Sequence, residues 1–307
     1  MSTYDIIVIG SGLAGLTAGL FAARHGLSTL VMESNIPGGH LISIEKIEDF
    51  PGFPDGIPGY ELCPNLQRQA ADHGAEFQRA EVLSLKMQAT FWSVVTEEER
   101  HNAKAVIIAT GSTLKNLGVP GEEKLTGRGV SHCASCDGPL YNGQTVGVVG
   151  GGDSALQEAL TLTNYAERVL LFHDGEKFIA QQTYQQRVLD NSKITPRYQT
   201  LIDEISGDDV VTGVRLRDLT TGEIAQVDLA GLFVYVGLQP NTALLRDLVK
   251  LSNTGHVPTD VSMQTEQPGL YAVGDIRQDS ASQAITSAGD GATAAIAAYQ
   301  YIKKSFS

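Results

Sequence analysis

The sequence predicts an α/β protein of two Rossmann-like three-layer domains, in which a nucleotide-binding domain is inserted into the other domain. Three observations lead to this fold class. An apolar run at residues 4–10 leads into GSGLAG and an alanine-rich helical stretch. The same order returns at Thr145, where TVGVVG leads into GGGDSA. Two further apolar runs, KAVIIATGS and GLYAVGD, predict strands that end at Gly111 and at Gly274 and Asp275 respectively. A strand, a tight glycine turn and a helix in succession form the β-α-β unit of a dinucleotide-binding fold.

The elements follow in order along the chain. In the first unit we expect a strand at residues 4–10, a helix that ends near His25, and a second strand in STLVMES. In the second unit a helix at about residues 155–165 precedes the strand RVLLFH. Apolar and polar residues alternate across residues 207–230 around Thr-Gly turns, which predicts a small antiparallel hairpin. The tail from Gly289 is rich in small residues and predicts a helix.

Glycine and proline mark two points at which the chain crosses between the domains, at residues 114–120 and 237–241. We therefore expect residues 1–114 and 243–307 to build one domain. Residues 115–242 are expected to build the inserted domain.

The composition excludes some classes of partner. A formal charge of −13 argues against nucleic acid, because phosphate binding needs clustered Lys and Arg, and the 22 basic residues form no long run. We find no bilayer-spanning apolar stretch and no signal-peptide pattern, so we expect no membrane association and a cytoplasmic location. Three cysteines are too few for the disulfide framework of a secreted protein.

The first glycine turn has the context that a dinucleotide site requires. Gly10, Gly12 and Gly15 satisfy G-x-G-x-x-G directly after a strand and at the start of a helix. Backbone N–H groups and the positive end of the helix then face a pyrophosphate. Glu33 lies at the end of the second strand, where a carboxylate binds ribose hydroxyls.

The second glycine turn differs at its ribose end. Gly150, Gly152 and Ala155 satisfy G-x-G-x-x-A, but His173 takes the place that Glu33 holds in the first copy. Asp174 follows His173, and the neighbouring sequence contains no arginine to bind a 2′-phosphate. The sequence alone therefore favours NADH over NADPH, or a site that no longer binds nicotinamide.

Two of the three cysteines form a C-x-x-C pair, Cys133 and Cys136, followed directly by Asp137. Two thiols at this spacing can close a disulfide ring that a reduced flavin opens, and Asp137 can move the proton. Zinc is the rival interpretation, but a closed site needs four ligands, and the remaining histidines and Cys63 lack paired spacing. We expect no metal, an inert buried Cys63, and an ordinary surface position for His132.

The motifs, taken together, are similar to those of a known family. The chain carries, in order, GSGLAG, PGG, EDFPGF, IIATGS, HCASCDGPLYNG, GGGDSA, YVGLQPNT, YAVGDI and QAITSAGDGATAA. This succession resembles the low-molecular-weight bacterial thioredoxin reductases, which are FAD-dependent pyridine nucleotide-disulfide oxidoreductases. The resemblance runs from end to end, and C-x-x-C-D just ahead of GGGDSA is its most specific part.

The resemblance implies a cofactor, a mechanism and a set of site residues. In this family the first unit binds FAD, the inserted domain binds NADPH and carries the cysteine pair, and two domains of a homodimeric enzyme rotate during turnover. By position, Cys136 would face the flavin, Cys133 would attack the partner, and Asp137 would be the acid-base residue. The expected FAD-binding residues are Gly10, Gly12, Leu13, Ala14, Gly15, Glu33, Gly38, Gly39, His40, Asp49, Gly111, Gly274, Asp275, Gln283, Ala284 and Ile285. The expected nicotinamide-nucleotide residues are Gly150, Gly152, Asp153, Ser154 and Ala155.

The chain departs from the family pattern chiefly at the nucleotide site. Where the family has His-Arg-Arg and a further Arg, this chain reads HDGEKFI from His173, so that all three arginines are replaced. Asp174 would repel a 2′-phosphate, while Lys177 would compensate in part. The other departures replace Gln, Asn and Arg of the family, at His40, Asp49 and Ser282 respectively. Some relatives that lack these arginines take electrons from ferredoxin or an unidentified donor.

The leading hypothesis is a thioredoxin reductase-like flavoenzyme that passes electrons from a donor through FAD to Cys133 and Cys136 and on to a thioredoxin-like protein. NADH is the donor we expect if the second site works, with NADPH left open. One alternative uses a ferredoxin-type donor or runs as a dithiol oxidase. Another alternative, from a different class, is a non-catalytic flavin-binding redox sensor, against which the intact cysteine pair and Asp137 argue.

Overall fold

The computed structural model describes residues 2–306, which divide into two compact units. Of the described residues, unit 1 contains 2–113 and 239–306, and unit 2 contains 114–238. The inserted unit thus begins one residue before the predicted boundary and ends four residues before it. The reason is that residues 239–242 bond to unit 1: the Asn241 amide donates to the Gly111 carbonyl oxygen at 3.0 Å, and its side-chain Nδ2 donates to the Thr110 carbonyl oxygen at 3.0 Å.

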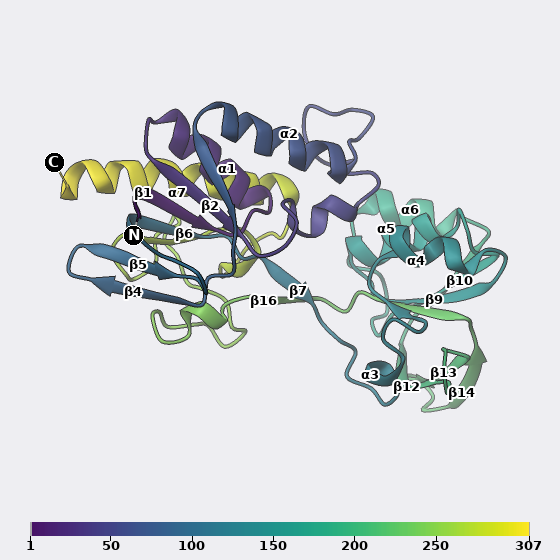
Figure 1. Ribbon diagram of the computed structural model, residues 1–307. Helices are drawn as coiled ribbons and strands as arrows, with labels where there is room; N and C mark the ends of the chain where they lie inside the picture. Colours follow the sequence, from purple (N-terminus) through teal and green to yellow (C-terminus); the bar gives the residue numbers. More distant parts are fainter. Residues whose placement is uncertain (1, 307) are drawn as a thin grey trace. The chain divides into compact units, whose positions relative to one another are not determined.

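Unit 1 is built on a seven-stranded sheet of order β3-β2-β1-β6-β5-β4, in which β17 pairs with β6 (Figure 1). The strands β3, β2, β1, β6 and β17 are parallel, and β4 and β5 add an antiparallel hairpin beside the first half of β6. The strands are β1 (Ser2–Ile9), β2 (Thr29–Glu33), β3 (Ala75–Arg79), β4 (Ser84–Gln88), β5 (Phe91–Val95), β6 (Arg100–Ile108) and β17 (Leu270–Ala272). The helices are α1 (Leu13–Arg24), α2 (Gly59–Asp72) and α7 (Ala284–Ser305), with 3-10 turns η1 (Gly39–Ser43), η3 (Ala243–Leu245) and η4 (Gly274–Ile276).

Alternation along β1 explains why both faces of this sheet are covered. Ile6 and Val8 join a buried cluster with α1 and α7, which lie side by side over one face (Figure 1). Ile7 and Ile9 point to the opposite face and join a cluster with Trp92 and the segment around η3. The helix predicted from Gly289 begins earlier, at Ala284, because Gln283 and Thr286 form a capping box at its start.

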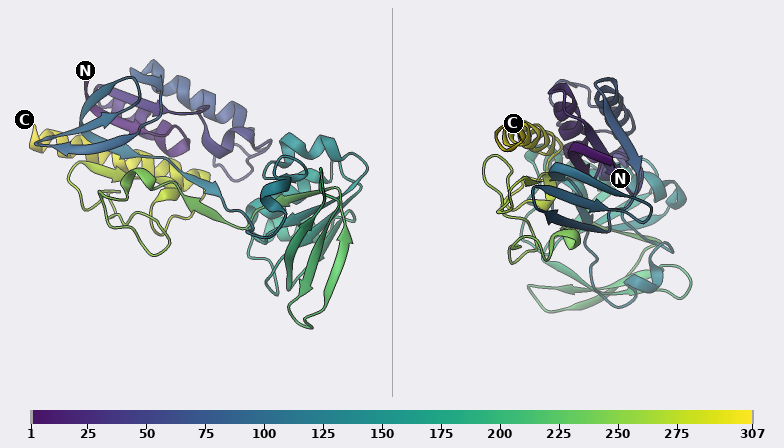
Figure 2. Two further views of the ribbon diagram at one scale, coloured as in Figure 1. Left: turned by 60° about the horizontal axis from the view of Figure 1, so that its bottom comes forward. Right: turned by 60° about the vertical axis from the view of Figure 1, so that its left-hand side comes forward.

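Unit 2 is a second three-layer body whose middle layer is a parallel sheet of order β11-β10-β9-β15-β8. One face packs on α5 and α6, and the other packs on the antiparallel sheet β12-β13-β14 (Figure 2). The strands are β8 (Val130–Ser131), β9 (Thr145–Val149), β10 (Arg168–Phe172), β11 (Ile194–Arg197), β12 (Thr200–Ser206), β13 (Gly213–Asp218), β14 (Ile224–Asp228) and β15 (Gly231–Val234). The helices are α3 (Glu122–Leu125), α4 (Ala134–Asp137), α5 (Asp153–Leu162) and α6 (Gln182–Leu189), with the 3-10 turn η2 (Gly138–Tyr141).

The hairpin predicted within residues 207–230 corresponds to β13 and β14, which pair antiparallel. The two chain crossings between the units, β7 (Ser112–Leu114) and β16 (Leu238–Pro240), pair with each other. Across residues 2–306, no helix is long and apolar enough to cross a membrane.

Candidate active site of a disulfide oxidoreductase

The glycine turn of unit 1 is shaped by backbone contacts that only glycine permits. Gly10 has a φ of +99°, and a Cβ there would lie 2.3 Å from the Ala109 carbonyl oxygen. A Cβ on Gly15 would lie 1.9 Å from the Gly10 carbonyl oxygen, so this glycine lets α1 start directly against the end of β1. A Cβ on Gly12 would meet nothing within 4 Å, which leaves the amino end of α1 open to a phosphate group.

Glu33 lies at the end of β2 and bonds to the same turn. Its Oε2 accepts hydrogen bonds from the Ser11 backbone N at 2.8 Å and from Ser11 Oγ at 2.9 Å. The Gly38 amide donates to the Ser11 carbonyl oxygen at 2.8 Å, and a Cβ on Gly39 would lie 3.5 Å from Gly12 Cα. The structure therefore brings Glu33 together with Gly38 and Gly39 around the start of α1.

The C-terminal part of unit 1 reaches the same edge of the sheet. Asp275 Oδ2 accepts from Ser112 Oγ at 3.1 Å, and His40 Nε2 donates to the Ser112 carbonyl oxygen at 2.5 Å. Gly274 has a φ of +72°, and a Cβ there would lie 3.3 Å from Ala14 Cβ. These contacts join four segments that are far apart in the sequence.

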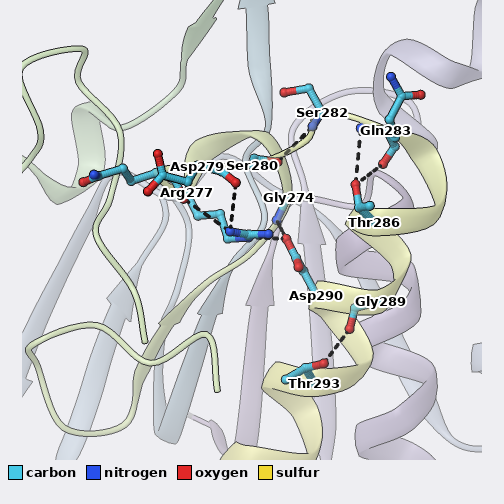
Figure 3. Close-up of polar contacts among 11 residues, drawn as sticks. Gly274, Arg277, Asp279, Ser280, Ser282, Gln283, Thr286, Gly289, Asp290 and Thr293 are labelled. Atoms are coloured by element: carbon cyan, nitrogen blue, oxygen red, sulfur yellow. Dashed lines mark hydrogen bonds and ion pairs between the residues drawn. The ribbon is translucent and has the colours of Figure 1, made fainter. Parts of the chain in front are cut away.

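A buried ion pair fixes the backbone that carries Gly274 (Figure 3). Asp290 on α7 accepts from the Gly274 amide at 3.1 Å and from Arg277 Nε at 2.6 Å. Arg277 also donates through Nη1 to the carbonyl oxygens of Gln278 and Asp279, which ties the loop before α7 to this pair. A half-buried guanidinium and a buried carboxylate in direct contact satisfy each other, so the loop is held without an unpaired charge.

The remaining predicted FAD residues lie at this edge or on the segments next to it. Gln283 is the residue before α7, Ala284 and Ile285 form its first turn, and Gly111 lies between β6 and β7 with a φ of +63°. Leu13 and Ala14 begin α1 and are buried, whereas Asp49 is exposed on the segment between η1 and α2. The uncovered amino end of α1 suits a pyrophosphate, and the carboxylate of Glu33 suits ribose hydroxyls. The glycines of the turn let a ligand come close to the backbone. Together these features fit a dinucleotide such as FAD.

The glycine turn of unit 2 repeats this geometry with one difference. Gly150 has a φ of +140°, and a Cβ there would lie 2.3 Å from the Tyr235 carbonyl oxygen. Gly152 again has open space beside it at the start of α5. Ala155 is buried at the third position and Ser154 is exposed in the first turn. Asp153 accepts from the Gln181 amide at 2.7 Å, which fastens the loop before α6 to the start of α5.

The ribose end of this turn is filled by His173. Its ring is buried, and a Cβ on Gly151 would lie 2.4 Å from it. Its Nδ1 lies 3.2 Å from Asp174 Oδ1, and its Nε2 donates to the Lys177 carbonyl oxygen at 3.1 Å. The Asp174 side chain is 67% exposed, so a carboxylate stands in solvent at the point where the family carries arginine.

One basic residue near this point could not be found from local sequence. Arg197 at the end of β11 pairs in register with Phe172, and its carbonyl oxygen accepts from the His173 amide at 2.9 Å. The paired position places Arg197 on the same sheet face as Phe172, whereas His173 is one residue further and points to the opposite face. Parallel pairing of two strands supplies this neighbour, which the short stretch after His173 does not reveal.

The predicted redox pair is a closed disulfide between Cys133 and Cys136. Cys136 is exposed, and its backbone amide donates to Cys133 Sγ at 3.2 Å. Asp137 Oδ2 accepts from Ser131 Oγ at 2.6 Å, and Ser131 Oγ accepts from the Cys133 amide at 3.1 Å. Ser131 was not among the predicted site residues, although the serine two residues before a reactive cysteine was a usable signal.

Two further side chains approach this turn from other elements. Glu158 on α5 accepts from the Ala134 amide at 3.0 Å and from Tyr235 Oη at 3.2 Å. Burial, followed by the charge of Glu158, raises the pKa of Tyr235 well above its usual range. Tyr235 is therefore a neutral hydrogen-bond donor at every physiological pH. Sequence separations of 24 and 77 residues hid both contacts from motif analysis.

The other histidine and cysteine expectations have clear places. Cys63 is buried in α2, and burial raises its pKa to about 11, which makes it an inert thiol. His132 is half-buried, with Nδ1 donating to the Val234 carbonyl oxygen at 2.8 Å, so it is more enclosed than the surface position predicted for it. In the described part of the chain, no group of three or more His, Cys, Asp or Glu residues could hold a metal ion.

Comparison with known proteins places this site in a family. The family model for pyridine nucleotide-disulphide oxidoreductases matches residues 4–291. A thioredoxin reductase of Mycolicibacterium smegmatis is 42% identical over 302 residues, which are 98% of this chain and 97% of that protein. The crystal structure of Lactococcus lactis thioredoxin reductase is similar with a TM-score of 0.96 and 38% identity, covering 98% of this chain and 99% of that one. The T. acidophilum thioredoxin reductase structure is similar with a TM-score of 0.94 and 34% identity over both full chains.

A dinucleotide turn in each unit and a redox disulfide beside the second one define a flavin-dependent disulfide oxidoreductase, and the chain belongs to the pyridine nucleotide-disulphide oxidoreductase family. Within that family it is a thioredoxin reductase-like flavoenzyme with FAD as its cofactor. The predicted fold class and enzyme class are confirmed. The relatives do not favour the ferredoxin-dependent, dithiol-oxidase or redox-sensor alternatives.

Proposed function

We propose that this flavoenzyme reduces the disulfide of a thioredoxin-like protein, with Cys133 as the attacking thiol, Cys136 as the thiol toward the flavin and Asp137 as the acid-base residue. The observation that carries the proposal is the closed Cys133–Cys136 disulfide with Asp137 bound to the same turn through Ser131. The relatives named thioredoxin reductase support the choice of partner.

The turn itself supports the division of roles between the two cysteines. The Cys136 amide donates to Cys133 Sγ at 3.2 Å, and an N–H group in this position stabilises a thiolate on Cys133. When bound, FAD supplies the two electrons that open the disulfide. Asp137, held by Ser131 at 2.6 Å, gives and takes the proton at the thiol pair.

Electrons and atoms balance in the exchange with the partner. The Cys133 thiolate attacks one sulfur of the partner's disulfide, which forms a mixed disulfide and releases one partner thiolate. Cys136 then attacks Cys133 Sγ, which closes the ring again and releases the second partner thiolate. Two electrons pass to the partner, and its two thiolates gain two protons, one from Cys136 through Asp137 and one from solvent.

We place the binding of the electron donor at the glycine turn of unit 2, with NADH preferred to NADPH. Gly152 leaves the start of α5 open for a pyrophosphate, as Gly12 does in unit 1. The exposed carboxylates of Asp174 and Glu176 lie at the end of β10, where a 2′-phosphate would require cations. Lys177 follows these acids on the same loop and opposes that preference in part.

The test mixes the oxidised holoenzyme anaerobically with NADH and, separately, with NADPH while flavin absorbance is followed. We expect rapid bleaching by NADH and slower bleaching by NADPH. Thioredoxin is then added, and its thiols are counted with a chromogenic disulfide. C136S should keep its flavin and its bleaching but lose thiol production. If dithionite bleaches the flavin but neither nucleotide does, the donor assignment is wrong. The role of the dithiol is then tested with reduced ferredoxin as the donor.

The homodimer and the cytoplasmic location stay predictions. Light scattering of the purified holoenzyme measures the former, and fractionation of cells that express it measures the latter. A monomer at micromolar concentration would contradict the dimer that the family resemblance implies.

A further inference from the structure

A second carboxylate contacts the redox turn from behind. Glu158 Oε2 accepts from the Ala134 amide at 3.0 Å, and the nitrogen of that amide is bonded to the carbonyl carbon of Cys133. Tyr235 Oη donates to the same oxygen at 3.2 Å from the end of β15. Ala134 and Tyr235 are buried and Glu158 is half-buried, so water screens this carboxylate only partly.

We propose that Glu158 is a positioning residue for the redox pair, whose carboxylate holds the Cys133–Ala134 peptide and whose negative charge opposes the ionisation of the reduced Cys133 thiol that the Cys136 amide favours. The inference rests on the proposed role of Cys133 as the attacking thiol. It adds a residue that acts through the turn rather than on the substrate.

Two carboxylates contact the turn, Asp137 through Ser131 and Glu158 through Ala134. Asp137 lies on the turn itself, and its charge adds to the burial that raises the pKa of Tyr141 on η2. Tyr235 faces the turn as a neutral donor, and His132 uses Nδ1 to bond the Val234 carbonyl oxygen. Glu158 therefore adds a negative charge from α5 to that of the acid-base residue on the turn.

Hydrogen bonding and charge at position 158 can be separated by substitution. Glu158→Gln keeps a side-chain oxygen for Ala134 and Tyr235 but removes the charge. Glu158→Ala removes both. Tyr235→Phe keeps the charge and removes a donor that partly neutralises it, so it acts in the opposite direction.

The experiment measures the pH dependence of iodoacetamide alkylation of Cys133 in the reduced holoenzyme, read by mass spectrometry of the peptide. We expect the E158Q profile to move to lower pH, with at least about threefold faster alkylation at neutral pH, because a nearby anion no longer disfavours the thiolate. Y235F should move the profile to higher pH. Cys63 serves as an unreactive internal reference, since burial raises its pKa to about 11.

Glu167→Gln is the matched control. Glu167 is an exposed carboxylate just before the start of β10, whereas the redox turn follows the end of β8, at the other end of the parallel strands. Its profile should match the wild-type profile. An E158Q profile that superimposes on the wild type would overturn the proposal, as would a change confined to E158A, which would show a structural role alone. The readout needs no partner, so a failure to reduce thioredoxin would appear in the turnover assay and not here.

Discussion

The two glycine turns of this chain have the same strand, turn and helix but differ at the ribose end. In unit 1 Glu33 bonds twice to Ser11 and leaves Gly12 open beside it. In unit 2 a buried histidine ring packs on Gly151, and its neighbour Asp174 faces solvent. One motif thus supports two kinds of site, because the glycines determine the approach of the pyrophosphate and the end of the second strand determines the ribose that fits.

The third motif position shows the same divergence in packing. Gly15 touches the Gly10 carbonyl oxygen so closely that no side chain fits, whereas unit 2 has Ala155, whose Cβ packs against Gly150. The third position of the motif therefore excludes a side chain in unit 1 and holds a methyl group in unit 2. Replacing each of these residues by its counterpart in the other unit tests whether this difference in packing affects stability.

The largest effect is expected for Gly15→Ala. The added Cβ would lie 1.9 Å from a backbone oxygen, so β1 and α1 must separate, at a cost of about 3 kcal/mol or more in the free energy of unfolding. The measurement is urea unfolding followed by Trp92 fluorescence, since this single tryptophan is buried in unit 1. Bound FAD should fall in parallel.

The reciprocal substitution, Ala155→Gly, is the control. Glycine in a helix costs about 0.5–1 kcal/mol, so unit 2 should remain folded and Trp92 unfolding should be unchanged. Equal losses from both variants would show that the two turns do not differ in the way their contacts indicate.

Glu33→Ala should have the next largest effect. It removes a charged acceptor from the Ser11 amide and hydroxyl and leaves a buried N–H without this partner, so FAD affinity should fall by about tenfold to a hundredfold. The measurement is the recovery of flavin fluorescence on dilution of the holoenzyme. Glu98→Ala, an exposed acid between β5 and β6, is the control and should bind FAD as the wild type does. Unchanged affinity in E33A would remove the ribose-binding role from Glu33.

These contacts also show how far the sequence could predict the molecule. Both β-α-β units, the glycine positions, Glu33 and the C-x-x-C-D pair follow from local patterns, because each depends on residues within one turn or on the strand that follows it. Ser112 with Asp275, and Glu158 with Ala134, depend on contacts across 163 and 24 residues. Such pairs exist only once the sheet order is fixed, and no local periodicity records them.

Contacts between residues far apart in the sequence also explain why the predicted end of the inserted domain differs from the observed one. Proline and glycine at residues 237–241 indicate a crossing, but the hydrogen bonds of Asn241 to Gly111 and Thr110 assign the last residues of that crossing to unit 1. The bond from Asn241 to Thr110 spans 131 residues, so the local sequence does not reveal it.

Asp174→Arg tests the ribose end of unit 2. Arginine at the end of β10 would add a charge-assisted bond to a 2′-phosphate and remove a repulsion, so affinity for NADPH should rise by about tenfold or more while affinity for NADH changes less. Titration of the holoenzyme with NADP⁺ and NAD⁺ by isothermal calorimetry measures both. If the wild type bound NADP⁺ more tightly than NAD⁺, the proposed preference of unit 2 for NADH would be wrong.

The smallest effect concerns how the two units anchor the start of their first strands. In unit 1 Asp5 pairs with Lys104 at 2.7 Å and accepts from the Ser28 amide at 2.9 Å, whereas β9 of unit 2 begins at the uncharged Thr145. Burial tends to raise the pKa of Asp5, but the bonds from Lys104 and Ser28 outweigh it and lower the pKa overall.

Because the folded-state pKa of Asp5 is lowered, the unfolded state binds the proton more tightly. The contribution of Asp5 is therefore present above the unfolded pKa and is lost as the pH falls through the folded one. Asp5 is partly exposed and screened by solvent, so Asp5→Asn should cost less than about 1 kcal/mol at neutral pH. Urea unfolding followed by Trp92 fluorescence at neutral and acidic pH should show the difference between D5N and wild type shrink as the pH falls. A difference that stays constant with pH would assign the effect to the Ser28 hydrogen bonds rather than to the charge.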